Sequence, residues 1–370
     1  MKRAALTAEH KIVRVELSER SYDIEIGAEI ISKAPEFFAA RTKISHAILI
    51  TDDQVRPLYG EPIARACAAA GMRTTLLSVP AGETSKSITM ADRLWNESLD
   101  AGADRKSVVI AVGGGVVGDL GGFIAASFAR GLAFFQVPTT LLAQVDSSVG
   151  GKVGINLPSA KNMVGAFWQP QGVLIDVDVL QTLPEREYRA GLAEVVKYGV
   201  ILDPEFFAFL ENNVEAINRR DQNALTHVIA RSCQLKADVV QADERETTGL
   251  RAVLNYGHTF CHAFEATCGY GELLHGEAVS IGMLCASRLA ELLERIPAEV
   301  TERQLKLLTA LGLPTTPPKV DIDQVMAAMQ RDKKVEHGRL QFVLPTTLGH
   351  VELVGDVPAN LAKRAINDGD

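Results

Sequence analysis

Several features that mark secreted, nucleic-acid-binding or membrane-bound chains are missing from this sequence. Its five cysteines form no Cys-x-x-Cys pair, and such an odd, scattered set predicts free thiols in a reducing compartment. The chain has no lysine- or arginine-rich run and a net charge of −8, which argues against a nucleic-acid surface. The N-terminal segment lacks the apolar core of a signal peptide. We therefore expect a cytoplasmic protein that binds neither nucleic acid nor membrane.

Long hydrophobic runs are also scarce, and the one exception is residues 108–129. This stretch carries a single charge, Asp119, and has the length of a membrane span. Its six glycines are better explained by a tight turn followed by a closely packed helix inside an α/β domain. We therefore expect this stretch to be buried in protein and not in lipid.

The 370 residues, 47% of them hydrophobic, are too many for one ordinary core and suggest two domains. The first half alternates predicted strands and helices, which is typical of a Rossmann-like α/β domain with a mainly parallel sheet. From about residue 180 the periodicity is helical nearly to the end, with no internal repeat. We predict an α/β N-terminal domain, residues 1–177, and an all-α C-terminal domain, residues 178–370. The predicted strands include an early hairpin in 11–27 and the segments 46–51, 73–79, 107–112, 133–138 and 173–177.

A glycine-rich turn follows the predicted strand 107–112. Gly113 to Asp119 fits Gly-x-Gly-x-x-Gly between a buried strand and a helix, where backbone N–H groups and the helix dipole can hold a phosphate. No acidic residue lies about 20 positions further on, so a standard dinucleotide fingerprint is incomplete. A glycine turn that serves only packing is the structural alternative.

Polar residues at other strand ends add to the case for a nucleotide. Asp52 and Asp53 end the strand 46–51, where a carboxylate can hold ribose hydroxyls, and Thr139 and Thr140 open a helix after 133–138. The loop 146–165 is rich in glycine and serine and contains Lys152, Lys161 and Asn162, which suits a phosphate. Each residue alone has a simpler explanation as a helix cap or a surface lysine.

Two histidines in NYGHTFCH, His258 and His262, lie four residues apart and so share one face of a helix. His275 begins a predicted helix, and Glu194 with Lys197 lies on one face of another. A catalytic zinc-type site needs three protein ligands and an open position. The candidate ligands are Glu194, His258, His262 and His275, and spacing alone leaves open which three bind.

The chain resembles the 3-dehydroquinate synthase family over nearly its whole length. The motifs that carry the resemblance occur in order: AGETSK, GGGVVGDLGGF, ARG, PTTLLAQVDSSVGGKVGIN, KNMVGAF, AGLAEVVKYG, GLRAVLNYGHTF, LLHGEAVSIGM and RDKKVEHGRLQFVLP. The resemblance implies a lyase of the shikimate pathway. It converts the sugar acid phosphate DAHP (3-deoxy-D-arabino-heptulosonate 7-phosphate) into 3-dehydroquinate and phosphate. It also implies transient reduction of NAD, one divalent metal (zinc or cobalt) and a homodimer.

The resemblance also implies roles for individual residues. The implied metal ligands are Glu194, His258 and His275, which leaves His262 near the substrate. The implied catalytic or substrate contacts are Arg130, Asp146, Lys152, Asn162, Lys197, Lys236, Arg251, Asn255, His262 and one of Lys333 and Lys334, with Arg130 reaching the partner subunit. The implied NAD contacts are Asp52, Glu83, Lys86, Gly114, Gly115, Val116, Val117, Gly118, Asp119, Thr139, Thr140, Lys152, Lys161 and Thr182.

One position departs from the family pattern: Cys261 stands where GHTxGH has its second glycine. A cysteine should pack there at some cost in helix closeness, and a thiolate ligand is the alternative. Three other functions stay open: a sugar phosphate cyclase of the inosose or valiolone type, a metal-dependent polyol dehydrogenase, and a non-catalytic nucleotide-binding module. Arg251 and Asn255 favour a carboxylate-bearing substrate, and the Lys/His/Glu set disfavours a mere binding module.

Overall fold

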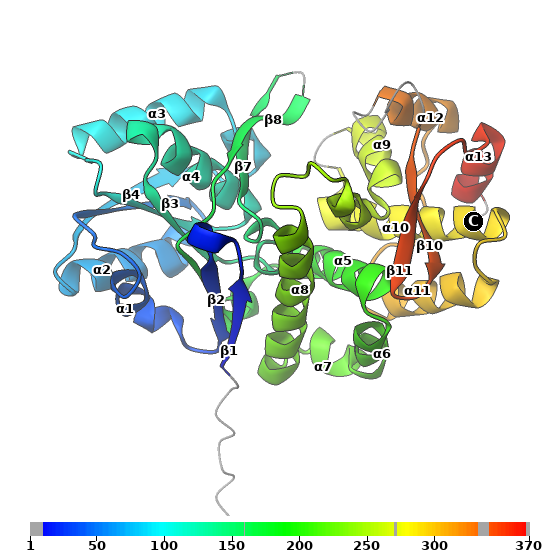
Figure 1. Cartoon of the computed structure of the whole chain (residues 1–370), viewed down its shortest axis with the longest axis horizontal. Helices are drawn as coiled ribbons and strands as arrows, with labels where there is room; N and C mark the ends of the chain where they lie inside the picture. The colour runs from blue at the N-terminus through cyan, green and yellow to red at the C-terminus, as the bar shows by residue number, and fades with distance from the viewer. Residues whose placement is uncertain (1–9, 159, 270–271, 332–339, 368–370) are drawn as a thin grey trace, which may run out of the picture. The chain divides into compact units, whose positions relative to one another are not determined.

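The computed structural model describes residues 10–158, 160–269, 272–331 and 340–367 (Figure 1). The chain divides into two compact units, the first made of residues 1–183 and 222–245 and the second of residues 184–221 and 246–370. The units are interleaved along the chain because helix α8 (Gln222–Ala242) packs with the first unit. The two domains expected from the sequence were continuous segments.

The first unit is built around a seven-stranded sheet in the order β1-β2-β9-β6-β5-β3-β4. Its strands are β1 (Lys11–Val15), β2 (Tyr22–Gly27), β3 (His46–Asp52), β4 (Arg73–Val79), β5 (Val108–Gly113), β6 (Ala133–Pro138) and β9 (Gly172–Asp176). Only β1 is antiparallel to its neighbour, and all other pairs are parallel. The predicted α/β fold, mainly parallel sheet and early hairpin are confirmed.

Helices cover both faces of this sheet, as Figure 1 shows for α3 and α4 on one side and α1 and α2 on the other. Successive strand residues face opposite sides. Ile48 and Ile50 of β3 therefore pack towards α3 (Ile88–Asp100) and α4 (Gly115–Ser127), whereas Ala47 and Leu49 pack towards α1 (Ala34–Ala39) and α2 (Glu61–Ala69). Burial on both faces explains why these strands read as continuous apolar runs.

The strand order reverses between β3 and β5, because the chain runs outward from β3 to β4 and returns on the other side of β3. The two strands pair in parallel with Thr51 opposite Val112, so Asp52 and Gly113 lie next to each other at the carboxyl edge. Ligands of open α/β sheets bind at such a switch point. The fold therefore places the glycine turn and Asp52 where a nucleotide is expected.

The rest of the first unit consists of α8, short helical turns and one hairpin. The hairpin pairs β7 (Lys152–Leu157) with β8 (Ala160–Phe167) and was not predicted, since this segment was expected to be a loop. The helical turns of the described chain, one of which belongs to the second unit, are η1 (Ser18–Arg20), η2 (Ile31–Lys33), η3 (Arg56–Gly60), η4 (Glu83–Ser85), η5 (Phe128–Arg130), η6 (Ala143–Ser147), η7 (Val177–Thr182) and η8 (Leu250–Asn255).

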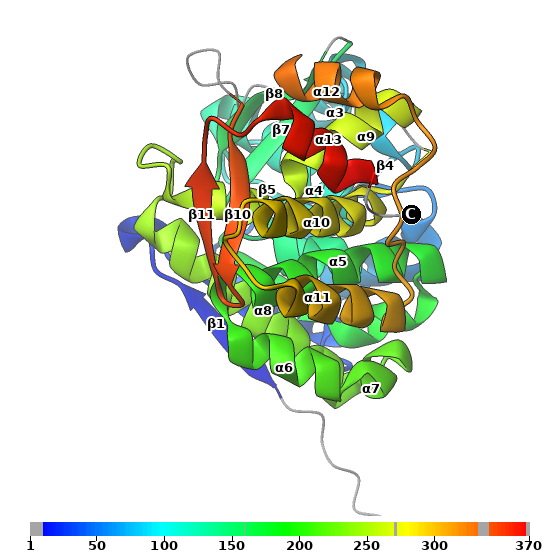
Figure 2. The same cartoon turned by 90° about the vertical axis from the view of Figure 1, so that its right-hand side faces the viewer.

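The second unit is helical, as predicted, with one additional hairpin. Its helices are α5 (Glu185–Leu202), α6 (Pro204–Asn212), α7 (Val214–Asn218), α9 (His258–Cys268), α10 (His275–Leu292), α11 (Ala298–Ala310), α12 (Ile322–Arg331) and α13 (Ala359–Asn367). The hairpin β10 (Phe342–Thr347) and β11 (His350–Val354) was not predicted. Figure 2 shows α10 surrounded by α5, α9, α11, α13 and β10.

Glycines allow the central helices of the second unit to approach closely. A Cβ on Gly276 would lie 1.8 Å from the carbonyl oxygen of Ala190 on α5, so only glycine fits there. Gly257, with φ +78°, precedes α9, and a Cβ there would lie 2.7 Å from the backbone nitrogen of Met283 on α10. These contacts set the positions of α5, α9 and α10 relative to one another.

The apolar stretch 108–129 is divided between β5 and α4, both part of the α/β core. Among the described residues, no helix has the length and hydropathy that a membrane span requires.

Candidate functional site

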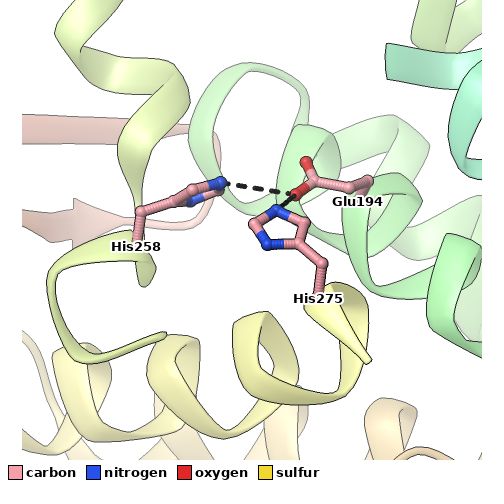
Figure 3. Close-up of side chains that lie close together, drawn as sticks. All are labelled: Glu194, His258 and His275. Atoms are coloured by element: carbon pink, nitrogen blue, oxygen red, sulfur yellow. Dashed lines mark ion pairs between the residues drawn. The ribbon is translucent and has the colours of Figure 1, made fainter. Parts of the chain in front are cut away.

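One carboxylate and two imidazoles from three helices of the second unit converge on a common point (Figure 3). The Oε1 atom of Glu194 lies 3.5 Å from Nε2 of His258 and 3.7 Å from Nε2 of His275. All three ligand atoms lie within 4.8 Å of one another. The side chains of Glu194 and His258 are buried, whereas that of His275 is 35% exposed, so the cluster has one open side.

Each member of the cluster has a defined local position. Glu194 lies in the middle of α5, and His258 and His275 are the first residues of α9 and α10. The start of α10 is fixed by Glu277, whose Oε2 accepts a hydrogen bond from the N–H of Leu274 at 2.8 Å. Arg186 donates two further hydrogen bonds of 2.7 Å to the same carboxylate. His275 therefore projects from a helix end that is anchored to α5.

The donor set fits a divalent cation of the zinc type. Three protein ligands with an open side are the arrangement of catalytic sites. Nδ1–H of His258 donates to the carbonyl oxygen of Tyr256 at 3.1 Å, which leaves the Nε2 lone pair directed at Glu194. Lys197, predicted on the same face of α5, forms an ion pair with Glu194 Oε2. A carboxylate that is only 1% exposed would be costly to bury without such partners.

The two remaining candidates of the NYGHTFCH segment lie beside the cluster. The ring of His262 is 5.6 Å from that of His258 and 6.5 Å from that of His275, and its nitrogens are outside the three-residue group. Cys261 Sγ lies 3.8 Å from Nδ1 of His275, on the side of the ring away from Glu194. Cys261, Glu265 and His275 form a second group of possible ligands.

Protonation in this region is shifted in two directions. Burial raises the pKa of the Cys261 thiol, which favours the neutral form. Burial lowers the pKa of His275, but the Cys261 sulfur and the carboxylates of Glu265 and Glu194 outweigh it, so the pKa lies well above its ordinary value. A cation binds Nε2 only when that nitrogen carries no proton, so metal binding here competes with protonation of the ring.

In the first unit, the glycine turn at the end of β5 is closely approached by the side chains of Thr140 and Ser147. A Cβ on Gly114 would lie 3.0 Å from Thr140, and one on Gly115 would lie 3.0 Å from Ser147. Gly114 has a φ of −74°, which any residue can adopt, so a side chain there would require only that Thr140 move by a few tenths of an ångström. The packing alternative is supported at Gly118, where a Cβ would approach Gln136 of β6 to 2.9 Å.

Several predicted nucleotide contacts are joined in one hydrogen-bonded group. Nζ of Lys86, which is only 4% exposed, lies 2.7 Å from Asp119 Oδ2 and 2.5 Å from Asn162 Oδ1. Glu83 lies 3.7 Å from the same ammonium and accepts a hydrogen bond from Asn156 at 2.7 Å. Burial raises the pKa of Asp119, and Lys86 opposes this shift.

Other predicted residues of the first unit lie at separate positions. The ammonium group of Lys236 on α8 contacts Asp146 twice. It lies 2.8 Å from the carboxylate and 2.7 Å from the backbone carbonyl oxygen of Asp146. Asp52 accepts hydrogen bonds from the next turn, and Thr182 bonds to Tyr59 at 2.7 Å. Among the other predicted residues of this unit, Arg130 and Lys152 are exposed and Thr139 is buried. Lys161 lies on β8, and Val116 and Val117 lie on α4.

In the second unit, Arg251 is buried at 3% exposure and Asn255 ends the same turn, η8. Lys333 and Lys334 lie outside the described residues. Sequence reasoning missed Tyr256, whose backbone carbonyl has no sequence signature, and Glu265. The spacing of Glu265, seven residues after His258, could have indicated a shared helix face.

The chain is similar to known proteins over nearly its whole length. The family models for the N-terminal and C-terminal parts of 3-dehydroquinate synthase match residues 76–190 and 191–335. A 3-dehydroquinate synthase of Rhodopirellula baltica is 51% identical over 360 residues, covering 96% of each chain.

Two solved structures are similar over nearly all of both chains. The first, a 2-deoxy-scyllo-inosose synthase complexed with carbaglucose-6-phosphate, NAD+ and Co2+, has a TM-score of 0.89 and 27% identity, covering 97% of this chain and 100% of its own. The second, a 2-epi-5-epi-valiolone synthase from Streptomyces hygroscopicus with NAD+ and Zn2+, has a TM-score of 0.86 and 29% identity, covering 100% and 99%.

The fold is therefore that of the sugar phosphate cyclases. Within this class, the chain belongs to the 3-dehydroquinate synthase family. Its activity is that of a lyase of the shikimate pathway, as the resemblance of its motifs predicted.

Proposed function

We propose that the chain converts DAHP into 3-dehydroquinate and phosphate with a divalent cation held by Glu194, His258 and His275. The observation that carries this assignment is the convergence of the three ligand atoms within 4.8 Å. The open side at His275 leaves room for substrate oxygens, as a catalytic metal requires. His262 is proposed as a nearby substrate contact and not as a ligand.

The proposed cofactors are NAD and one zinc or cobalt ion, in line with the groups bound to the two solved cyclases. When bound, NAD supplies a reversible hydride acceptor, and the cation lowers the pKa of a substrate hydroxyl. The proposed NAD contacts all belong to the first unit: Asp52, Glu83, Lys86, Gly114 to Asp119, Thr139, Thr140, Lys152, Lys161 and Thr182.

The substrate DAHP carries two anionic groups, a carboxylate and a phosphate, and the residues proposed for substrate binding suit them. Guanidinium binds carboxylate in a bidentate manner, so Arg251 is assigned to the substrate carboxylate. Lysine ammonium groups suit a phosphate and stabilise it as a dianion when it leaves. The remaining proposed contacts are Asp146, Lys152, Asn162, Lys197, Lys236, Asn255, His262 and one of Lys333 and Lys334.

The contribution of the protein to each step is mainly orientation and charge. Lys197 forms an ion pair with the buried Glu194 carboxylate, which offsets part of the cost of burying this ligand. His262 is proposed to shuttle protons or to hold the phosphate, because its imidazole lies beside the cluster without belonging to it.

The decisive experiment is incubation with DAHP and a catalytic amount of NAD, with phosphate release and NADH absorbance followed together. We expect stoichiometric phosphate without net NADH. Net NADH would indicate a polyol dehydrogenase, and turnover of a sugar phosphate without a carboxylate would indicate an inosose or valiolone synthase.

The metal assignment has its own test. Glu194→Ala and His275→Ala are expected to lose the metal in elemental analysis, whereas His262→Ala, the matched control from the same helix, keeps it but turns over more slowly. Stoichiometric metal in the first two variants would contradict the ligand set.

A homodimer working in the cytoplasm, with Arg130 acting at the partner subunit, completes the proposal. The free thiols support a reducing compartment. Arg130→Ala mixed with a second inactive variant, such as Lys197→Ala, should regain activity in mixed dimers. A mixture as inactive as its parents would argue against shared sites.

A further inference from the structure

The two imidazole ligands differ in what lies behind them. Each neutral ring can offer one nitrogen lone pair, and the partner of its other nitrogen decides which nitrogen this is. Behind His258 this partner is the carbonyl of Tyr256, at 3.1 Å from Nδ1. Behind His275 the surroundings are ionisable: Nδ1 lies 3.6 Å from Glu265 Oε1 and 3.8 Å from Cys261 Sγ.

The face of α9 that begins with His258 provides this second environment. Cys261 and Glu265 follow His258 by three and seven residues, so the three side chains lie along one side of the helix. His258 therefore contributes to the cluster directly, while the next two turns of the same face contact His275 of α10.

Cys261, Glu265 and the His275 ring contact one another. Cys261 Sγ lies 3.8 Å from Glu265 Oε2, within the range for a sulfur donor, and equally far from the carbonyl oxygen of His275. The other carboxylate oxygen of Glu265 faces His275 Nδ1. The Glu265 side chain is only 12% exposed, so its charge is poorly screened and acts strongly on the imidazole. The separation of 3.6 Å is longer than a hydrogen bond, so the contact between Glu265 and the His275 ring is electrostatic in this structure.

We propose that Glu265 is a positioning residue that keeps the proton of His275 on Nδ1, so that Nε2 faces the cation, and that the Cys261 thiol holds Glu265 in place. This inference rests on the metal site proposed above. Cys261 replaces a glycine of the family pattern. In this proposal the cysteine supports a residue behind a metal ligand and is not itself a ligand. Outer-shell carboxylates of this kind raise the basicity and fix the orientation of metal-bound histidines.

The alternative use of the same atoms is a second metal site formed by Cys261, Glu265 and His275. The distances between the three ligand atoms would allow it. His275 could then serve both sites only as an imidazolate, or one site at a time through opposite nitrogens. Binding of a soft cation at the thiol would thus compete with the first site, whereas the positioning function supports it.

The test measures the affinity of the metal-free protein for Zn2+ by competition with a chromophoric chelator. Glu265→Ala should weaken binding about 10- to 100-fold, the usual effect of removing an outer-shell partner. Glu265→Gln keeps an acceptor oxygen and should recover part of the loss. Cys261→Gly, which restores the family residue, should weaken binding by less than Glu265→Ala. The control Glu291→Gln, at the far end of α10, should bind Zn2+ like the parent.

Further measurements separate positioning from general damage. The metal-free Glu265→Gln protein should unfold at the parental temperature, while its Co2+ form shows a changed visible spectrum because the His275 ligand is altered. Parental Zn2+ affinity in Glu265→Ala would overturn the inference, as would a second equivalent of Cd2+ with a thiolate charge-transfer band that Cys261→Gly abolishes. If Glu194→Ala also binds Zn2+ like the parent, the metal site itself is wrong, which is a distinguishable result.

Discussion

Replacing Gly276 by alanine tests how α10 is placed against α5. The new Cβ would lie 1.8 Å from the carbonyl oxygen and 2.5 Å from the carbonyl carbon of Ala190. Both are backbone atoms in the middle of a buried helix, so they cannot rotate away. Because real Cβ atoms essentially never come within 3.0 Å of such atoms, α10 must move by more than about 1 Å.

Two opposing effects decide the sign of the change in stability. Alanine in a helix is favoured over glycine by about 1 kcal/mol. Overpacking costs about 1–3 kcal/mol, and a clash with a fixed backbone belongs at the upper end of this range. We therefore expect a net loss of about 1–2 kcal/mol. A displacement of about 1 Å at the adjacent His275 should also lower turnover about 100-fold.

Thermal unfolding of the metal-free protein and a Zn2+ competition assay measure the two effects. Gly355→Ala is the matched control, because a Cβ there meets no atom within 4 Å and its φ is not in the left-handed region. It should change stability by less than about 0.5 kcal/mol. If Gly276→Ala unfolds at the parental temperature and binds Zn2+ equally well, α10 does not rest on α5 as described.

Three further predictions concern ionisable groups. Hydrogen bonding to Arg189 lowers the pKa of the half-exposed Glu185. The ionised carboxylate therefore stabilises the folded protein, by under about 1 kcal/mol, at pH values above the pKa that Glu185 has in the unfolded chain. This stabilisation is lost as the pH falls. The difference in unfolding temperature between the parent and Glu185→Gln should thus close towards about pH 4, and a constant difference would contradict it. Lys86→Met should cost about 1–3 kcal/mol near neutral pH, since Asp119 is left without its ammonium partner. Burial already raises the pKa of Asp119 above its unfolded value, so this loss should shrink as the pH falls and Asp119 becomes protonated, and a loss that grows would refute it. Thiol titration of the native protein should modify Cys268 first, because the other cysteines are buried, and rapid reaction of more than one thiol would disprove this. Burial raises the pKa to about 11 for Cys67 and to about 12 for Cys233 and Cys285.

The sheet and the cluster were predictable because their signals are local. Strands buried on both faces are short apolar runs, and the carboxyl end of each one is visible in the sequence. Glu194 and Lys197 share a helix face by spacing, and His275 was expected to begin a helix, as it does in α10. What spacing could not provide was the choice among the histidines, which depends on how three helices pack.

Both missed hairpins lack the usual strand signal. The β7–β8 pair contains Gly154 and Gly165, where a Cβ would approach the opposite backbone to 2.6 and 2.2 Å, so their glycines serve close pairing and not flexibility. The β10–β11 pair contains Pro345, beside which the register shifts. Proline normally argues against a strand, and it is tolerated here at an irregularity.

The contacts of α8 also could not be predicted from local sequence. Helical periodicity indicates that one face of a helix is buried, but it does not indicate which element covers that face. Lys236 reaches Asp146 over 90 residues of sequence, and Gln222 reaches Asp178 over 44. Glu265 was missed for the same reason, since its partner His275 belongs to the next helix.

The insertion of residues 184–221 between the two segments of the first unit has a consequence for synthesis on the ribosome. Because α8 packs on β1 and β2, the earliest strands must wait for a helix made some 200 residues later. A fragment that stops at residue 183 would expose the surface that α8 covers and should aggregate. Separate production of the halves therefore requires a rearranged gene in which residues 222–245 directly follow residue 183.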